Sequence, residues 1–185
     1  MPKVEANDLN GVMPAMITSF NKDESINKEG LRNIINHSIN EKVNGLYVTG
    51  STGETFLMSP EEKKRAIDII VEEVNGRVPV IAHIGSIGTK ITTDLAEYAT
   101  KAGVDGLSAL PPFYYNFTNE EIFNYYSDIA KSSDLPIIIY NIERANLMDI
   151  DTLKKLAAIE NIKGVKYTAA TPVSYTHLRA HETDR

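Results

Sequence analysis

Two successive apolar runs of the sequence end in residue types that could react with a carbonyl compound. Lys166 lies in "IKGVKYT", and Tyr140 closes "IIIYN". A lysine on a buried strand loses water around its ammonium, which favours the neutral amine, a nucleophile for ketones. A neighbouring tyrosine hydroxyl could relay a proton. The alternatives are a lysine that merely ends a strand in solvent and a buried tyrosine with a hydrogen-bonded hydroxyl.

A glycine-rich stretch and an aromatic stretch could complete such a site. In "GSTGE", Gly50–Glu54, the glycines permit a tight turn, and Ser51 and Thr52 add hydroxyl donors. Such a turn could bind a carboxylate or a phosphate, although a plain strand-to-loop turn is the alternative. "PPFYYNFT", residues 111–118, is a rigid aromatic loop that could equally pack against another subunit.

The histidines carry less weight. We expect His83 to be a hydrogen-bonded core residue and His37 to lie on a helix surface. His177 and His181 have a metal-ligand spacing in "HLRAH", but no glutamate stands between them and no third ligand is near. We therefore expect no metal site.

The elements that must position these residues recur about every thirty residues, the length of a strand, a helix and two loops. Six short apolar runs suit strands of a parallel sheet covered by helices. They are "GVMPAMITSF" (11–20), "GLYVTGS" (45–51), "VPVIAHIG" (78–85), "DGLSAL" (105–110), "LPIIIYNI" (135–142) and "IKGVKYT" (162–168).

The segments between these runs carry helix signals. Ser59 with Glu62, and Thr118 with Glu121, form two capping-box patterns, and Pro60 suits a first helical position. The sequence thus predicts six strand–helix units, which fit an open doubly wound sheet or a barrel. The connection after the first run contains no Gly-x-Gly-x-x-Gly motif, so the sequence gives no support for a dinucleotide site. Because polar or aromatic residues end nearly every strand, we favour an α/β fold, a (β/α)8 TIM barrel represented by its first six units.

Composition excludes several classes of protein. The 185 residues are 42% hydrophobic and 24% charged, with a net charge of −6, so nucleic acid is not an expected partner. No cysteine is present for disulfides or thiolate chemistry, which suits a reducing compartment. The first residues lack the apolar core of a signal peptide, and no apolar run approaches the ~20 residues that span a bilayer. We expect a cytoplasmic protein that does not bind membranes.

Taken together, "GSTGE", "PFYYNFT", "YNI" and "GVKYTA" resemble, in order and spacing, the N-acetylneuraminate lyase and dihydrodipicolinate synthase family of class I Schiff-base aldolases. The resemblance runs from Gly11 to Ala169. It implies a (β/α)8 barrel, a homotetramer, a keto-acid substrate and no cofactor, because the substrate is held as a covalent Schiff base. By position it implies that Lys166 forms the Schiff base, that Tyr140 relays the proton, and that Ser51 and Thr52 hold the pyruvyl carboxylate.

Further positions bear on the branch of the family. By the same resemblance, Thr168 matches a substrate contact of the lyases, and Tyr114 a tyrosine at a subunit contact beside the site. The synthase branch has a motif resembling "YNVPxRTG", whose arginine binds the carboxylate of the second substrate. This chain has "YNIERANL", with Ala145 at the position of that arginine. Arg144 lies one residue earlier, and Glu143 replaces a proline. These residues favour the lyase branch, which cleaves N-acetylneuraminate reversibly to N-acetylmannosamine and pyruvate.

Three alternatives stay open at this point. The chain could belong to a 4-hydroxy-tetrahydrodipicolinate synthase, to another pyruvate-dependent aldolase of the family, or to a non-catalytic anion-binding barrel. We expect residues 1–172 to be a partial barrel domain and residues 173–185, "VSYTHLRAHETDR", to be a non-native tail, since that stretch does not resemble the family. An unclosed sheet exposes apolar side chains, so we expect the 185-residue chain alone to aggregate or to be unstable, and to be inactive.

Overall fold

The structure, a computed structural model, describes residues 9–168. Its five strands form one parallel sheet in the order β1-β2-β3-β4-β5. The strands are β1 (Leu46–Val48), β2 (Val80–His83), β3 (Gly106–Ala109), β4 (Ile137–Ile142) and β5 (Ile162–Thr168). The helices are α1 (Lys28–Asn40), α2 (Pro60–Val74), α3 (Thr89–Ala102), α4 (Asn119–Lys131) and α5 (Ile150–Ala157), with a short 3₁₀ turn, η2 (Ser51–Gly53).

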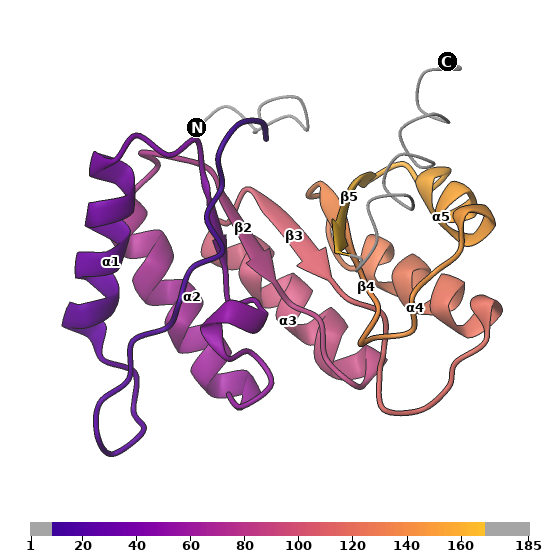
Figure 1. The fold of residues 1–185 in the computed structure, drawn as a ribbon, viewed down its shortest axis with the longest axis horizontal. Helices are drawn as coiled ribbons and strands as arrows, with labels where there is room; N and C mark the ends of the chain where they lie inside the picture. The colour runs from indigo at the N-terminus through magenta and orange to yellow at the C-terminus, as the bar shows by residue number, and fades with distance from the viewer. Residues whose placement is uncertain (1–8, 169–185) are drawn as a thin grey trace.

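The helices form one layer against one face of the sheet, and each helix packs against the next (Figure 1). Their apolar stripes and the outward residues of the strands form the main core, which includes Leu31, Ile67, Leu95, Ile129 and Leu156. The opposite face of the sheet is turned toward the viewer in Figure 1. This arrangement is the helix-covered wall of a (β/α) barrel, as the sequence predicts.

The segment at residues 11–20 forms no regular strand within residues 9–168, although the sequence predicts one. It makes a single parallel bridge to β1, between Ala15 and Tyr47. Pro14 has no N–H with which to extend this pairing backward. Thr49 has a φ of 53°, which turns β1 away before the pairing can extend forward. The segment therefore lies beside the edge of the sheet, where its backbone bonds to Tyr47 on both sides of Ala15 (3.1 and 2.9 Å) and to the Asn44 amide (2.8 Å) without forming a regular strand.

Both predicted capping boxes are confirmed. The Ser59 hydroxyl accepts from the Glu62 amide (3.2 Å) while the Glu62 carboxylate accepts from the Ser59 amide (2.8 Å). Thr118 and Glu121 make the same pair of bonds at 3.3 and 2.8 Å. These caps set where α2 and α4 begin. They thereby fix where the two loops after β1 and β3 end, and these loops carry Ser51, Thr52 and Tyr114 of the candidate site.

Strand register places several polar and aromatic side chains on the open face of the sheet. In a parallel ladder, paired residues point to the same face, as do residues two apart on one strand. His83 pairs with Ser108, and Tyr140 pairs with Lys166. Tyr47 pairs with Ile81, two residues before His83, and therefore shares that face.

Some sequence predictions fall outside the described part of the chain. These are the boundary at residues 172/173 and the pair His177 and His181. Within residues 9–168 there is no group of three histidine, cysteine or acidic residues placed to hold a metal ion. In that same range, no helix is both long enough and apolar enough to cross a bilayer.

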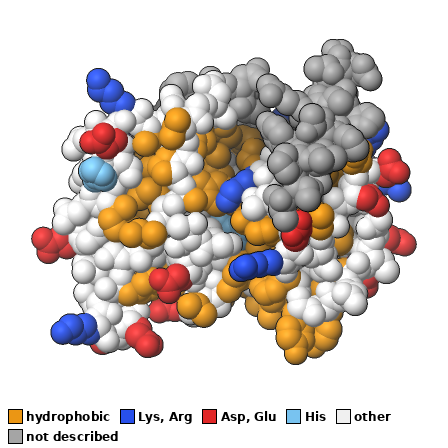
Figure 2. Space-filling view, in the orientation of Figure 1, with side chains coloured by type: hydrophobic (Ala, Val, Ile, Leu, Met, Phe, Trp, Pro, Cys, Tyr) orange, Lys and Arg blue, Asp and Glu red, His pale blue; other side chains and the backbone are white. Residues whose placement is uncertain are grey.

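The open sheet leads to a prediction about solution behaviour. Apolar side chains are exposed on the face shown in Figure 2, and the exposed large apolar residues include Val12, Ile17, Leu57 and Val165. Because exposed apolar patches and unpaired strand edges drive association, we expect the purified 185-residue chain to form aggregates of no defined size or to be unstable, and to bind a hydrophobic dye. The parent protein, the product of the natural gene from which this sequence comes, is the control. A monomeric chain with a cooperative melting transition would contradict this prediction.

Candidate active site

Lys166 lies on β5 with its amine between two tyrosine rings. Its Nζ is 4.0 Å from the ring centroid of Tyr140 and 4.3 Å from that of Tyr47. Both distances are within the range of cation–π attraction, which holds an ammonium over a ring face. The side chain is half-buried, so the amine is partly shielded yet accessible to a small molecule. The structure thus brings Lys166 and Tyr140 together from adjacent strands, as the barrel arrangement predicts.

Tyr47 is part of this cluster, although the sequence reasoning did not single it out. Its hydroxyl donates to Ser108 Oγ (2.9 Å), which donates to the Ile138 carbonyl (2.8 Å). Burial raises the pKa of Tyr47 well above its usual range, against the opposing effect of the Ser108 hydrogen bond. A Cβ at Gly50 would lie 2.8 Å from Cε1 of the Tyr47 ring, so only glycine fits there. Tyr47 is therefore a neutral, fixed ring beside the amine.

His83 is buried as expected, but the expectation that it is hydrogen-bonded is wrong. It is 1% exposed, and neither ring nitrogen has a hydrogen-bond partner among the described residues. Its neighbours are aromatic rings instead: Phe56 at 6.1 Å, Tyr140 at 6.2 Å and Tyr47 at 6.4 Å between centroids. Burial lowers the pKa of His83 to about 3, with smaller contributions from two nearby lysine charges. The imidazole is therefore neutral at physiological pH.

Lys63 on α2 is the second lysine near this cluster, and the sequence reasoning did not single it out either. The residue is 4% exposed, and its Nζ lies 5.7 Å from the centroid of the Phe56 ring. Burial lowers the pKa of Lys63 to about 8. Lys63 and Lys166 are the two charges that help to keep His83 unprotonated. The rings of Phe56 and His83 thus lie in a region of positive potential.

The glycine-rich stretch forms the turn η2 directly after β1. Ser51 and Thr52 are exposed, whereas Gly53 is buried and its carbonyl accepts from the Thr18 hydroxyl at 2.8 Å. The first amide groups of a helical turn have no partner within the turn and can bind an anion. Since β1 and β5 are parallel, the turn lies at the same end of the sheet as Lys166.

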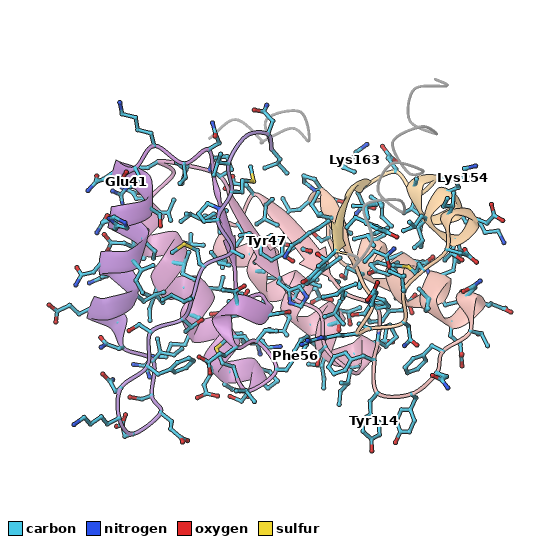
Figure 3. The ribbon with its side chains drawn as sticks, in the orientation of Figure 1. Glu41, Tyr47, Phe56, Tyr114, Lys154 and Lys163 are labelled. Carbon is cyan, nitrogen blue, oxygen red and sulfur yellow. The ribbon has the colours of Figure 1, made fainter. Side chains whose placement is uncertain are left out.

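The structure places the two remaining candidate residues differently. Thr168 is exposed at the end of β5 and, two residues after Lys166, points to the same face. Tyr114 is 85% exposed and has a φ of 83°. Figure 3 shows it at the tip of the loop before α4, far from Tyr47. The Tyr114 ring packs edge-on against that of Tyr115, 4.9 Å away between centroids, and its role at a subunit contact stays a prediction.

Two asparagines hold the loops beside the site. Asn141 is fully buried, and its side chain bonds both the amide (2.9 Å) and the carbonyl (3.2 Å) of Met148. This closes the loop after β4. Asn146 Nδ2 donates to the carbonyls of Pro112 (2.8 Å) and Tyr115 (3.1 Å), which ties that loop to the aromatic loop. Both loops therefore form one rim.

The position at which the synthase branch carries an arginine is filled by a packed alanine. Ala145 is 4% exposed and forms a small cluster with Leu110 and Tyr140. Arg144 is exposed. Position 145 itself thus carries no cationic group, although the resemblance puts there the arginine that binds a second carboxylate.

Comparison with known proteins identifies the family of the chain. The family model described as the dihydrodipicolinate synthetase family matches residues 8–184. The chain belongs to this family. The match extends past the predicted boundary at residue 172, which stays a prediction.

Individual family members show which proteins the chain is similar to. It is 44% identical over 165 residues to an N-acetylneuraminate lyase of Clostridium perfringens, covering 88% of this chain and 57% of that protein. A crystal structure of CdNal from Clostridium difficile in complex with mannosamine has a TM-score of 0.91 and 42% identity, covering 96% of this chain and 62% of that one. A dihydrodipicolinate synthase from Aquifex aeolicus has a TM-score of 0.87 at 29% identity, covering 92% of this chain and 59% of that one.

The chain spans slightly more than half the length of the curated family members it matches. Both solved structures share the fold over more than nine-tenths of this chain.

The buried neutral imidazole of His83 predicts acid sensitivity. The folded pKa of about 3 lies below the ordinary value of 6.5, so the unfolded chain binds the proton more readily between these values. The contribution of His83 to the free energy of unfolding is therefore complete above pH 6.5. It is lost as the pH falls toward 3, by at most about 1.4 kcal/mol per pH unit. We expect the urea midpoint of the parent protein to fall less steeply between pH 6.5 and 4.5 in H83Q.

H37Q is the matched control, because His37 is exposed on α1. It should keep the pH slope of the unmodified protein. A slope that is the same in H83Q and H37Q would show that folding does not lower the pKa of His83.

Proposed function

We propose that the parent protein is a Schiff-base aldolase that acts on pyruvate as donor or product. The observation that carries this proposal is the Lys166 amine between the rings of Tyr47 and Tyr140, with Tyr140 in register on the adjacent strand. A lysine in such a place needs no metal or organic cofactor to activate a ketone. The family membership of the chain supports the same chemistry.

The chemical steps follow from the residues present. In the cleavage direction, the Lys166 amine adds to the keto carbon and water leaves, which gives an iminium. Breaking the carbon–carbon bond beyond the adjacent carbon then sends its electron pair into the iminium, and an enamine results. The phenol proton of Tyr140 leaves with the water lost when the iminium forms, and the resulting phenolate oxygen takes the hydroxyl proton as the leaving carbon becomes an aldehyde. Protonation of the enamine and hydrolysis release pyruvate and the free amine.

The turn η2 would hold the carboxylate of the keto acid. Its Ser51 and Thr52 hydroxyls and the amides at its start can donate to a carboxylate, at the end of the sheet where Lys166 lies. Holding the carboxylate there would orient the keto carbon toward the amine. Thr168, on the same face two residues after Lys166, would contact the rest of the substrate.

Within the family we propose the lyase reaction, the reversible cleavage of N-acetylneuraminate to N-acetylmannosamine and pyruvate. The packed Ala145 supports it, since an arginine is missing where a synthase would grip a second carboxylate. The similarity to several N-acetylneuraminate lyases supports it as well. We further propose a cytoplasmic homotetramer of sialic acid catabolism in which Tyr114 lies at a subunit contact.

Reductive trapping tests the Schiff base directly. Incubation of the parent protein with pyruvate and borohydride should add the mass of one reduced pyruvate to Lys166, because reduction of the imine makes the bond permanent. K166A should give no adduct. K163A is the matched control, since Lys163 is exposed on the same strand, and it should be trapped normally. If pyruvate leaves Lys166 unmodified, the chain fits a non-catalytic anion-binding barrel instead.

The Tyr140 hydroxyl is predicted to act in proton transfer. Y140F should lower kcat for N-acetylneuraminate cleavage by about 10²- to 10⁴-fold, the usual effect of removing a general acid–base group. The adduct with pyruvate should still form, since its carboxylate and keto sites are intact. Y167F, which alters the neighbouring position on β5, is the control and should keep most of the activity. A Y140F enzyme with normal kcat would exclude the relay.

The branch of the family is tested by substrate choice. The parent protein should release pyruvate from N-acetylneuraminate and should not condense pyruvate with aspartate semialdehyde. We expect no condensation because Ala145 occupies the position at which a synthase carries the arginine for the second substrate. The opposite pair of results would assign the chain to the synthase branch.

A further inference from the structure

Thr49 has a backbone conformation that its residue type disfavours. It lies between the end of β1 and the turn η2, is 2% exposed and has a φ of 53°. A β-branched residue rarely adopts a positive φ, because its Cβ and branch atoms crowd the backbone there. Glycine would adopt the same conformation without this cost. A threonine at this position therefore suggests a use for its side chain.

The side chain of Thr49 ties two strand ends together. Its hydroxyl is shared between two carbonyl acceptors: it donates to the oxygen of Val48 at 2.7 Å and to the oxygen of His83 at 2.9 Å. His83 is the last residue of β2, the strand that pairs with β1. The bond to the His83 carbonyl thus continues the cross-strand connection at the point where the β1 backbone turns away.

The same bond connects the two halves of the candidate site. On one side, Thr49 is followed by Gly50 and the turn that begins at Ser51. On the other side, the ring of His83 packs against Tyr140 with a centroid distance of 6.2 Å. Tyr140 in turn contacts the Lys166 amine at 4.0 Å. A short chain of contacts therefore leads from the proposed carboxylate-binding turn to the proposed Schiff-base lysine.

Tyr47 also contacts both the turn after β1 and the Lys166 amine. Its ring lies so close to Gly50 that a Cβ there would come within 2.8 Å, and it also contacts the Lys166 amine at 4.3 Å. The turn is thus held on one side by Tyr47 and on the other by the Thr49 hydroxyl. Without the hydroxyl, the packing against Tyr47 and the bond from the Thr18 hydroxyl to the Gly53 carbonyl (2.8 Å) would remain, and the tie to β2 would be lost.

We propose that Thr49 is a positioning residue that sets the place of the Ser51–Gly53 turn relative to Lys166 through its hydrogen bond to the His83 carbonyl. The inference rests on the proposed function, since it takes the turn as the carboxylate site. Thr49 itself touches neither the keto acid nor the reacting atoms. Its effect should appear only for ketones that carry a carboxylate.

Two ketones and three variants test this in the parent protein. Pyruvate carries a carboxylate, whereas acetone reacts with the same amine and has none. T49S keeps the hydroxyl, T49A removes it, and T49G removes it while relieving the crowded backbone. The readout is the ketone concentration that gives half-maximal borohydride trapping on Lys166, with the thermal midpoint measured alongside.

We expect T49S to resemble the unmodified protein. T49A and T49G should need about five-fold more pyruvate, the effect of losing one ordinary hydrogen bond, while their trapping by acetone stays unchanged. A merely structural role would shift both ketones together or neither. If T49A fails to fold, T49G still gives the comparison, because glycine tolerates the positive φ.

Three results would overturn the inference. Unchanged pyruvate trapping in T49G would show that the hydroxyl does not place the turn. Equal weakening with pyruvate and acetone would show that Thr49 acts on the lysine or on the fold as a whole. Failure of the unmodified protein to be trapped by either ketone would overturn the proposed function itself, and with it this inference.

Discussion

The contact between the Lys166 amine and the rings of Tyr47 and Tyr140 depends on the strand register more than on any other feature. Tyr140 pairs directly with Lys166, and Tyr47 reaches the same place from the far edge of the sheet. A slip of one residue in β5 would turn Lys166 to the helix-covered face and replace it with an apolar neighbour. The helix layer covers only one face of the sheet and thereby fixes the register in which Lys166 points toward the site.

Around this contact the site is aromatic rather than polar. His83 is held among rings with both nitrogens unpartnered in the described structure, and it stays neutral beside two lysines. An acidic group in its place would attract the Lys166 ammonium and favour the charged form. A ring that adds no negative charge suits an amine that must lose its proton before it attacks a ketone.

The sequence was sufficient to predict the elements with local signals. The capping boxes at Ser59 and Thr118 and the five strands β1 to β5 follow from short patterns that tertiary contacts did not override. The facing of Tyr140 and Lys166 could be predicted because sequential strands of a barrel are neighbours. The first predicted strand did not form, because pairing there is limited by Pro14 and by the turn at Thr49.

The remaining features of the site could not be predicted, because they depend on distances between elements that are far apart in the chain. Tyr47 reads as an ordinary strand residue until the sheet places it beside Lys166. The positive φ of Thr49 and the unpartnered nitrogens of His83 have no local signature at all. Alternation along β1 could have suggested Tyr47, since it shares the inward face predicted for the other candidate residues.

A crystal structure of the parent protein with pyruvate tests the central claim most directly. The claim is that Lys166 forms the Schiff base while the turn after β1 holds the carboxylate. It predicts continuous density from Lys166 Nζ to the keto carbon, with the carboxylate within hydrogen-bond distance of Ser51 or Thr52. Pyruvate bound without a covalent bond to Lys166, or with its carboxylate away from that turn, would contradict it.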